Sequence, residues 1–489
     1  MTLLKHRSAV VSTCGVIGLL VFVPLATADD PPTTERVYYD GLDEEGNLVG
    51  GFVEMAMQPM TEHRRHGFRS MFGGPVVTTV IDNGDPLNRI DAVFVGDGYQ
   101  ASDLSAYNSH CQAGIDLFFS TEPLASYAGL FNVHRVDVIS NESGVDNDPT
   151  EGIDRDTALD MRFWCGGTER LLCVNTTLAW NFANYAPDAD QILAVANSTK
   201  YGGAGYSSSE IGTYAGGNGA AAQVALHELG HSLGNLADEY SYGGSETYSG
   251  GEPSARNVSI YDASEMQANT TKWHQWLNYN EGGWDGPVGT FEGASYSEFG
   301  IFRPSNNSLM RSLNRPFNLP SGEGLIIELY KIVDPIDDAT PLSPPLVGDE
   351  LIFVDPVDPG GSTLDIQWSI DGVEIAGATG ETFDLADFDL ATGDHSISVK
   401  VVDNTPWVRD EAARASYLSQ TRTWEIDRPE EPCVGDINGD LTVDLADFSV
   451  FLLNYGLESG GPSDLNNDLV VDLADFSLLL VNYGRVCSE

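Results

Sequence analysis

The chain has 489 residues, of which 42% are hydrophobic and 10% aromatic, so it can form at least one large core and is not disordered in bulk. Its 24 basic and 73 acidic residues give a formal net charge of −49. Such a charge repels the phosphates of nucleic acids and anionic membrane surfaces, so we expect neither as a partner. The length predicts several domains.

The first 28 residues are predicted to be a secretory signal peptide. A short basic region precedes an almost wholly apolar stretch from Ala9 to Leu25, and Ala26 to Ala28 supply the small residues of a cleavage site. The mature chain would begin near Asp29 and would be secreted or extracellular, with attachment to a cell surface as an alternative. An uncleaved anchor helix is the competing interpretation, because the apolar run approaches spanning length. We expect no membrane span after signal cleavage.

Residues 29–75 are polar and glycine-bearing, with one strand-like stretch from Gly51 to Met57, and are expected to be an N-terminal lead-in or a propeptide. A propeptide here would have no cysteine with which to occupy a metal. Residues 76–335 form the next predicted domain, of mixed α/β texture. Strands are predicted at Ile90 to Val95, Phe131 to Ile139 and Gln191 to Ala196, and helices at Ala101 to Phe119 and Gly219 to Gly234.

The second of these helices carries a His-Glu-x-x-His pattern. His227 and His231 lie one turn apart on one helix face, so both imidazoles can bind the same metal ion. Glu228 lies beside the first histidine, where it can take a proton from a water on the metal. This spacing is typical of zinc hydrolases. We therefore predict a catalytic Zn²⁺ with His227 and His231 as ligands and Glu228 as general base.

A catalytic zinc ion needs a third protein ligand and an open position for water. Asp238, seven residues after His231, is the first choice, and Glu239 is the alternative. Either carboxylate could instead form an ion pair at the helix end. His274 is another candidate ligand, although a partly buried histidine is the commoner role.

Other parts of the same domain suggest supporting roles around the metal. Met310 lies in a segment that resembles the methionine turn beneath the zinc of metzincins. A peptide substrate is expected along an edge strand near Ile211 to Tyr214, by strand addition. Candidate donors to the transition state are Tyr240, Tyr296 and Arg303, although a structural role is the commoner one for such residues.

A set of sequence blocks spread over this domain carries a family resemblance. The blocks are Asn88 to Tyr99, Phe131 to Asp137, Ser140 to Gly144, Asn197 to Gly205, His227 to Tyr240, Phe302 to Pro304 and Met310 to Arg311. In these blocks the chain resembles the IgA-peptidase family of secreted zinc metalloendopeptidases. The resemblance implies a zincin fold, endopeptidase activity, zinc on His227 and His231, and Glu228 as base. It does not specify an immunoglobulin as substrate.

A proline-rich stretch from Asp334 to Pro345 ends this domain. Residues 346–427 then show alternating strand patterns, such as Leu364 to Trp368 and His395 to Val402, separated by turn signals. This pattern predicts an all-β, immunoglobulin-like sandwich.

Residues 433–489 contain an internal duplication with a constant offset of 28 residues. Each copy places side-chain oxygens at the ligand positions of a calcium loop, except at position 7, which contributes its backbone carbonyl. An apolar helix follows each loop, so two Ca²⁺ ions are predicted. Position 6, where glycine eases the turn, is Leu441 in the first copy and Leu469 in the second. The predicted ligands are Asp436, Asn438, Asp440, Thr442, Asp444 and Asp447 in the first copy, and Asp464, Asn466, Asp468, Val470, Asp472 and Asp475 in the second.

This loop–helix duplication resembles a dockerin, which implies a cohesin-like receptor as the partner of residues 433–489. The leucines at position 6 and the apolar Leu-Ala pairs at positions 10 and 11 depart from the dockerin pattern, so a divergent receptor or a merely folded tail remain alternatives.

Export permits disulfides. Cys165 and Cys173 are close in sequence, and Cys433 and Cys487 bracket the last module, so these two pairs are predicted, leaving Cys111 as a buried free thiol. Sequence alone leaves other pairings open.

Together these features predict a multi-domain protein: an α/β zincin-like catalytic domain, an immunoglobulin-like sandwich and a small α calcium-binding module. The predicted function is secreted zinc endopeptidase activity on a protein or peptide substrate, tethered through the tail. One alternative is a non-catalytic adhesive or scaffold-associated protein with a structural metal, which has no need of Glu228 as a base. Another is a zinc hydrolase of non-peptide amide bonds.

Overall fold

The computed structural model describes residues 34–42, 48–56, 74–361, 364–428, 433–458 and 460–487. The predicted signal peptide, residues 1–28, and the predicted mature start near Asp29 lie outside these ranges. Within them, no helix is long and apolar enough to cross a membrane. The chain divides into two compact units, and the elements form several multi-strand sheets with helices, a multi-domain α/β architecture. The first unit comprises Met1–Asp338, Asp355–Asp365 and Val401–Gln420, and the second Ala339–Val354, Ile366–Lys400 and Thr421–Glu489.

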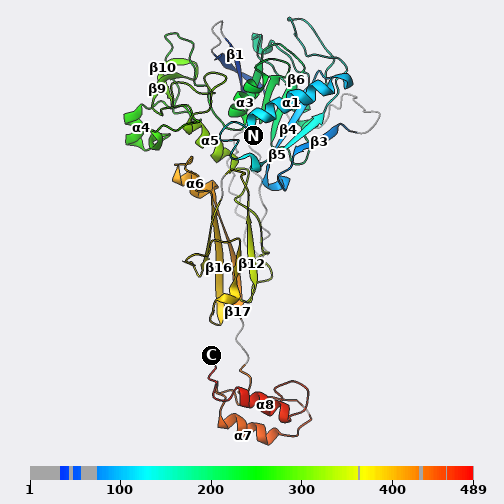
Figure 1. The fold of residues 1–489 in the computed structure, drawn as a ribbon, viewed down its shortest axis with the longest axis vertical. Helices are drawn as coiled ribbons and strands as arrows, with labels where there is room; N and C mark the ends of the chain where they lie inside the picture. The colour runs from blue at the N-terminus through cyan, green and yellow to red at the C-terminus, as the bar shows by residue number, and fades with distance from the viewer. Residues whose placement is uncertain are drawn as a thin grey trace, which may run out of the picture. The chain divides into compact units, whose positions relative to one another are not determined.

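An eight-stranded mixed sheet forms the centre of the first unit, with the order β2-β1-β7-β8-β6-β4-β5-β3 (Figure 1). The pairs β5–β4, β4–β6 and β6–β8 are parallel, and the others are antiparallel. The strands are β1 (Thr34–Leu42), β2 (Leu48–Ala56), β3 (Val76–Ile81), β4 (Ile90–Asp97), β5 (Phe131–Asp137), β6 (Gln191–Ala196), β7 (Gly203–Tyr206) and β8 (Ile211–Ala215).

Both faces of this sheet are covered, because alternate side chains of its central strands point into two different cores. On one face, Phe94 of β4 packs with α1 (Leu104–Phe118) and α3 (Ala221–Ser232). On the other, Val93 packs with α2 (Thr176–Ala183) and the loops before it. The three predicted central strands and both predicted helices are confirmed.

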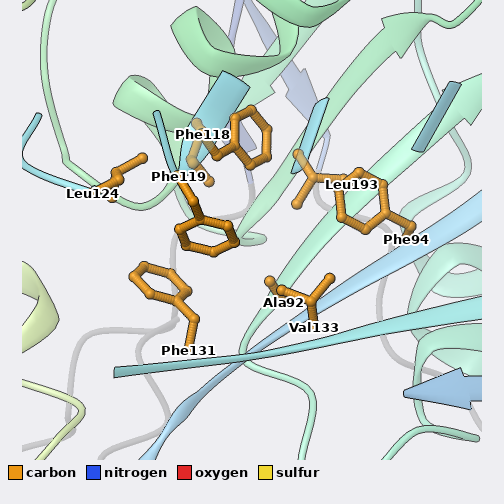
Figure 2. A pocket seen from close by; sticks show the side chains of 9 residues that line it. Ala92, Phe94, Phe118, Phe119, Leu124, Phe131, Val133 and Leu193 are labelled. Atoms are coloured by element: carbon orange, nitrogen blue, oxygen red, sulfur yellow. The ribbon is translucent and has the colours of Figure 1, made fainter. Parts of the chain in front are cut away.

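A small hollow lies on the first of these faces, between the sheet and the C-terminal end of α1 (Figure 2). Its walls are aliphatic and aromatic side chains only, so it is a packing defect of the core and offers no polar group to a ligand. The lining residues are Ala92, Phe94, Phe118, Phe119, Leu124, Phe131, Val133, Leu193 and Leu229.

The N-terminal segment adds two strands to the sheet where one strand-like stretch was predicted. β1 and β2 pair along nine residue pairs, from Thr34↔Ala56 to Leu42↔Leu48. β1 also pairs with β7 through Val37↔Tyr206 and Tyr38↔Gly205. β1, which precedes the predicted catalytic domain, therefore lies beside β7, a strand that contacts α3.

The rest of the first unit consists of short elements around α3. Cys165 pairs with Cys173 and Cys111 is a buried free thiol, as predicted. The elements are α4 (Ala263–Asn269), β9 (Phe291–Ala294), β10 (Ser297–Arg303), α5 (Leu319–Leu329) and α6 (Glu411–Tyr417), with short 3₁₀ helices at Pro86–Asn88, Ala101–Asp103, Ala128–Leu130, Cys165–Gly167 and His274–Trp276.

Two further sheets, with the orders β11-β12-β15 and β14-β13-β16-β17, follow the first domain in sequence. Trp368 of the second sheet stacks on Phe383 of the first, with ring centroids 5.2 Å apart, so the sheets share a core. The predicted sandwich spans 346–427, but its residues 355–365 and 401–420 belong to the first unit. The elements are β11 (Ile336–Ala339), β12 (Leu351–Pro356), β13 (Asp365–Ile370), β14 (Val373–Glu374), β15 (Thr382–Asp384), the 3₁₀ helix Leu385–Asp387, β16 (Gly393–Val402) and β17 (Ser419–Arg428).

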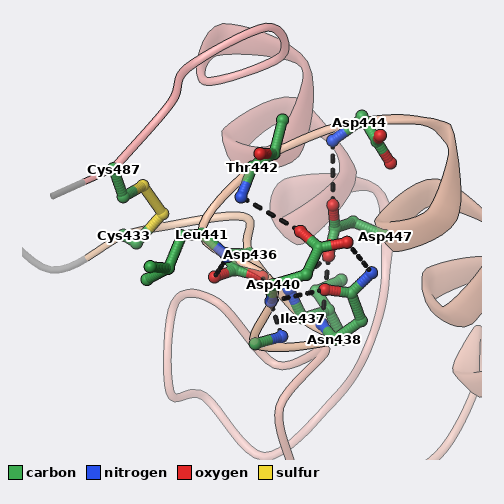
Figure 3. The surroundings of a disulfide bond; sticks show 11 residues. Cys433, Asp436, Ile437, Asn438, Asp440, Leu441, Thr442, Asp444, Asp447 and Cys487 are labelled. Atoms are coloured by element: carbon green, nitrogen blue, oxygen red, sulfur yellow. Dashed lines mark hydrogen bonds between the residues drawn. A yellow bond between two sulfur atoms is a disulfide. The ribbon is translucent and has the colours of Figure 1, made fainter. Parts of the chain in front are cut away.

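The C-terminal residues form two loop–helix copies that end in α7 (Leu445–Asn454) and α8 (Leu473–Val481). Phe451 and Leu479, at equivalent positions of the two helices, are buried in one small core. The predicted disulfide between Cys433 and Cys487 joins the ends of this module (Figure 3).

Candidate metal centre

The helix α3 holds both histidines with their rings fixed by backbone carbonyls. The Nδ1 atom of His227 lies 3.0 Å from the Leu309 carbonyl oxygen, and that of His231 lies 2.7 Å from the Leu236 carbonyl oxygen. Because a carbonyl only accepts, each Nδ1 carries the proton and donates it. Each Nε2 therefore presents a lone pair, as a metal ligand requires.

Two carboxylates meet these lone pairs. The two Nε2 atoms are 3.1 Å apart, and Asp238 Oδ1 lies 3.3 Å from each. Asp40 Oδ2, from β1, lies 2.5 Å from Nε2 of His227. All four side chains are buried, and neither of these carboxylate oxygens accepts a hydrogen bond from a described residue.

This donor set fits a bound cation. Two lone pairs and two anionic oxygens converge away from water, an arrangement that is costly unless a positive charge lies among them. Each residue offers one donor atom, all four atoms lie within 4.8 Å of one another, and two nitrogens with two oxygens suit zinc.

The pKa shifts of two of these side chains also favour a positive charge at the centre. Burial lowers the pKa of His227, but the Asp40 and Asp238 carboxylates outweigh it and raise that pKa well above its ordinary value. Burial raises the pKa of Asp238, but the imidazoles of His231 and His227 bring it below its ordinary value.

Two tyrosines form hydrogen bonds with the Asp40 and Asp238 carboxylates. The Tyr240 hydroxyl donates to Asp40 Oδ1 at 2.5 Å, and the Tyr296 hydroxyl donates a short hydrogen bond to Asp238 Oδ2. Both tyrosines are candidate donors to the transition state, and here their hydroxyls orient these two carboxylates. The third such candidate, Arg303, donates to the carbonyl oxygens of Glu292 and Gly293 instead.

Glu228 has a carboxylate without a hydrogen-bond partner among the described residues. Its side chain is buried against β7, so closely that a methyl group on Gly205 would lie 2.9 Å from Oε2. Burial, and next the negative charge of Asp40, raise its pKa well above the ordinary value, while His227 opposes the rise. A carboxylate of this kind is a stronger base than an exposed one.

The alternative ligands lie outside the group of four donors. The Glu239 carboxylate is buried and accepts hydrogen bonds from Asn257, Ser308 and Asn318, which tie the chain after α3 to the Met310 segment. His274 lies in a 3₁₀ helix and is not part of the group either.

The segment after Ser308 passes close to α3, in keeping with the predicted methionine turn. Met310 is buried, and its sulfur would lie 2.7 Å from a methyl group placed on Gly230. The neighbouring Leu309 carbonyl is the one that fixes His227.

Sequence reasoning missed Asp40 and misplaced the edge strand. Asp40 precedes His227 by 187 residues, and no motif marks it as a ligand. The predicted edge near Ile211 to Tyr214 is wrong, because β8 pairs with β6 on one side and β7 on the other. The strand that separates β8 from the N-terminal strands is β7.

The first C-terminal loop gathers Asp436, Asp440 and Asp447 into a group that could hold a cation (Figure 3). Asp436 accepts hydrogen bonds from the backbone N–H groups of Gly439, Asp440 and Leu441. Asp447 accepts three more, from Ile437, Asn438 and Asp444.

The second loop repeats this pattern. Asp464 accepts hydrogen bonds from the N–H groups of Asp468 and Leu469, and Asp475 from those of Asn466 and Asp472.

The remaining predicted calcium ligands also form hydrogen bonds within their own loops. Asp444 and Asp472 cap the first turns of α7 and α8. The Asn438 and Asn466 amides donate to Asp440 and Asp468, whose carboxylates also accept from the backbone N–H groups of Thr442 and Val470.

Residues 78–285 match the model of a family described as IgA peptidase M64. The matched range contains His227, Glu228, His231 and Asp238, and it begins after β1 and β2. A comparison with curated proteins finds no match. The family match supports an assignment to the IgA peptidases and a metallopeptidase-type hydrolase with a protein or peptide substrate.

Proposed function

We propose that the protein is a secreted zinc-dependent endopeptidase that hydrolyses peptide bonds through a metal-activated water, in a zincin-like domain. The observation that carries this proposal is the convergence of His227, His231 and Asp238 beside the unpartnered carboxylate of Glu228. These three residues would hold the zinc ion. When bound, zinc supplies a Lewis acid that polarises a carbonyl and makes a water molecule acidic at neutral pH.

Glu228 moves the proton in this proposal. Its carboxylate takes a proton from the attacking water and passes it to the departing amine, so one group acts first as base and then as acid. The Glu228 carboxylate is buried and has no hydrogen-bond partner among the described residues, so no other group competes for it in either step.

The test is cleavage of denatured casein by the mature chain, with zinc removed by 1,10-phenanthroline and then restored. Asp40 of β1 lies buried beside His227, where its carboxylate would block access to the metal. An Asp40→Ala variant, which removes this carboxylate, is therefore assayed in parallel. Cleavage that stops with the chelator and returns with zinc supports the proposal. Cleavage that continues unchanged in the presence of the chelator refutes the proposal. Activity confined to non-peptide amide bonds favours a zinc hydrolase of another class.

One observation favours a second candidate, a non-catalytic protein with a structural metal. Asp40 completes a set of four protein donors, and structural zinc sites are closed in this way. Glu228 argues against it, because a structural site has no use for an unpartnered buried carboxylate next to its ligands.

An alanine at position 205 is expected to lower the cleavage rate by about 10²-fold, since displacement of a catalytic group by about 1 Å has such an effect. The added methyl group would lie 2.9 Å from both Glu228 Oε2 and His231 Cβ, so the base must move. Steady-state kinetics on Asp40→Ala and on Asp40→Ala with Gly205→Ala measure the effect. Gly219→Ala is the matched control, because its methyl group would meet no atom within 4 Å. Equal rates for the two glycine variants would contradict this placement of Glu228.

For the C-terminal module we propose two bound Ca²⁺ ions and a dockerin-like role, tethering the enzyme to a cohesin-like receptor. Exposed apolar side chains support this role, because they recur at equivalent positions and so form two matching faces. The pairs are Leu445 and Leu473, Leu452 and Leu480, Leu453 and Val481, and Tyr455 and Tyr483.

Glycine at position 469 is expected to tighten calcium binding to the second loop. Leu469 has a φ of 73°, in the left-handed region that costs a leucine about 1 kcal/mol relative to glycine, or roughly fivefold in affinity. Calorimetric titration with calcium should show two sites, one of them tightened by Leu469→Gly. The control is Leu453→Gly, which alters an equally apolar, exposed helix residue outside the loops. Unchanged affinity in Leu469→Gly would show that the loop is not strained by the leucine.

A further inference from the structure

We propose that Asp40 is a fourth zinc ligand supplied by the N-terminal segment, and that β1 and β2 thereby hold the peptidase in a latent form. This inference rests on the proposed function. It assigns β1 and β2, residues 34–42 and 48–56, a regulatory role, and three observations support it.

The first observation is the position of the Asp40 carboxylate. One oxygen faces Nε2 of His227 at 2.5 Å and accepts no hydrogen bond, while Tyr240 fixes the other oxygen. The carboxylate is therefore aimed at the centre, where it completes four protein donors. A catalytic zinc has three protein ligands and one position for water, so Asp40 occupies the position that water needs.

The second observation is that β1 lies along the strand next to the catalytic helix. Val37 and Tyr38 pair with Tyr206 and Gly205 of β7, the strand against which Glu228 packs. The Tyr38 ring stacks on His231, with centroids 4.7 Å apart and an interplanar angle of 9°. A peptide substrate that binds by strand addition would need this same edge of β7.

The third observation is the complete burial of the chemistry. No side chain among His227, Glu228, His231 and Asp238 is more than 2% exposed, so a scissile carbonyl has no access to the metal position while β1 is in place. Among the described residues, β1 and β2 share nine residue pairs with each other and β1 shares two with β7. Activation in this proposal requires the two strands to leave the sheet together.

The experiment uses the full mature chain with cobalt(II) in place of zinc and acetohydroxamate as a small metal-binding probe. The variants are Asp40→Ala and the isosteric Asp40→Asn, which keeps the shape of the side chain if alanine impairs folding. Glu54→Ala is the matched control, because this carboxylate lies in β2 and is exposed in an ion pair with Arg36.

Visible absorption of the cobalt reports binding of the probe directly at the metal, whatever the enzyme activity. We expect acetohydroxamate to bind both Asp40 variants at least about tenfold more tightly than it binds the unmodified chain or the Glu54→Ala control. Equal affinity for all four proteins would overturn the inference, because a shielded metal cannot bind the probe as well as an open one.

Casein cleavage separates this inference from the proposed function. Cleavage by the Asp40 variants well above that of the unmodified chain supports both. Probe binding restricted to the Asp40 variants, with no cleavage by any protein, supports the shielding by Asp40 and refutes the peptidase. Equal cleavage by the unmodified chain and its variants supports the peptidase and overturns latency.

Discussion

Glu228→Gln is expected to lower the rate of peptide cleavage by about 10²- to 10⁴-fold while zinc stays bound, the range typical of a lost general base. Glutamine keeps the size of the side chain but has no basic oxygen, so the attacking water loses its proton acceptor. The ligands His227, His231 and Asp238 are unchanged, so the metal content should remain near that of the parent protein.

The measurement compares kcat/KM and zinc content of Asp40→Ala with and without Glu228→Gln. Glu151→Gln, which alters an exposed carboxylate in a loop, is the control and should leave both quantities unchanged. A Glu228→Gln protein that retains zinc and cleaves at the parental rate would exclude Glu228 as the base. Loss of zinc from this variant would instead show that Glu228 helps to hold the metal.

Removal of zinc is expected to lower the melting temperature of the unit that contains α3 by about 10 °C. Without the cation, the buried Asp40 and Asp238 carboxylates face the two imidazoles, and protonation of His227, whose pKa they raise, offsets only part of their charge. An uncompensated buried charge costs about 3–5 kcal/mol, and 1 kcal/mol shifts the melting temperature of a domain of this size by about 2–4 °C.

Differential scanning calorimetry with and without 1,10-phenanthroline measures this shift. Re-addition of zinc should restore the transition, whereas calcium should not, since calcium prefers six or more oxygen ligands. An unchanged transition after verified loss of the metal would mean that the four donors do not depend on a cation.

The sequence was most informative where chemistry follows from local spacing. His227 and His231 lie on one helix face because of helical periodicity, and the stretch from Ile90 to Val95, apolar apart from Asp91, is a buried central strand. The two disulfides followed from proximity in the chain and from the bracketing of the repeat.

What the sequence did not reveal depends on strand pairing between distant segments. The position of Asp40 beside His227 follows from the pairing of β1 with β7, which among the described residues involves Val37 and Tyr38 and leaves no periodic signal. β8 lies inside the sheet because β7 pairs with its other side. The sequence analysis expected an edge there because β7, a strand of only four residues, Gly203–Tyr206, was not recognised.

The carbonyl oxygens that orient the two imidazoles belong to the backbone of Leu236 and Leu309. Every residue type carries such an oxygen, so sequence drift at these two positions leaves both acceptors present. Only a change in the path of the chain, such as an insertion or deletion between His231 and Leu236, would move them. The orientation of the histidines should therefore persist in homologous chains whose side chains around the centre have diverged widely. Length changes in the segments that carry Leu236 and Leu309 should mark the chains in which this orientation is lost.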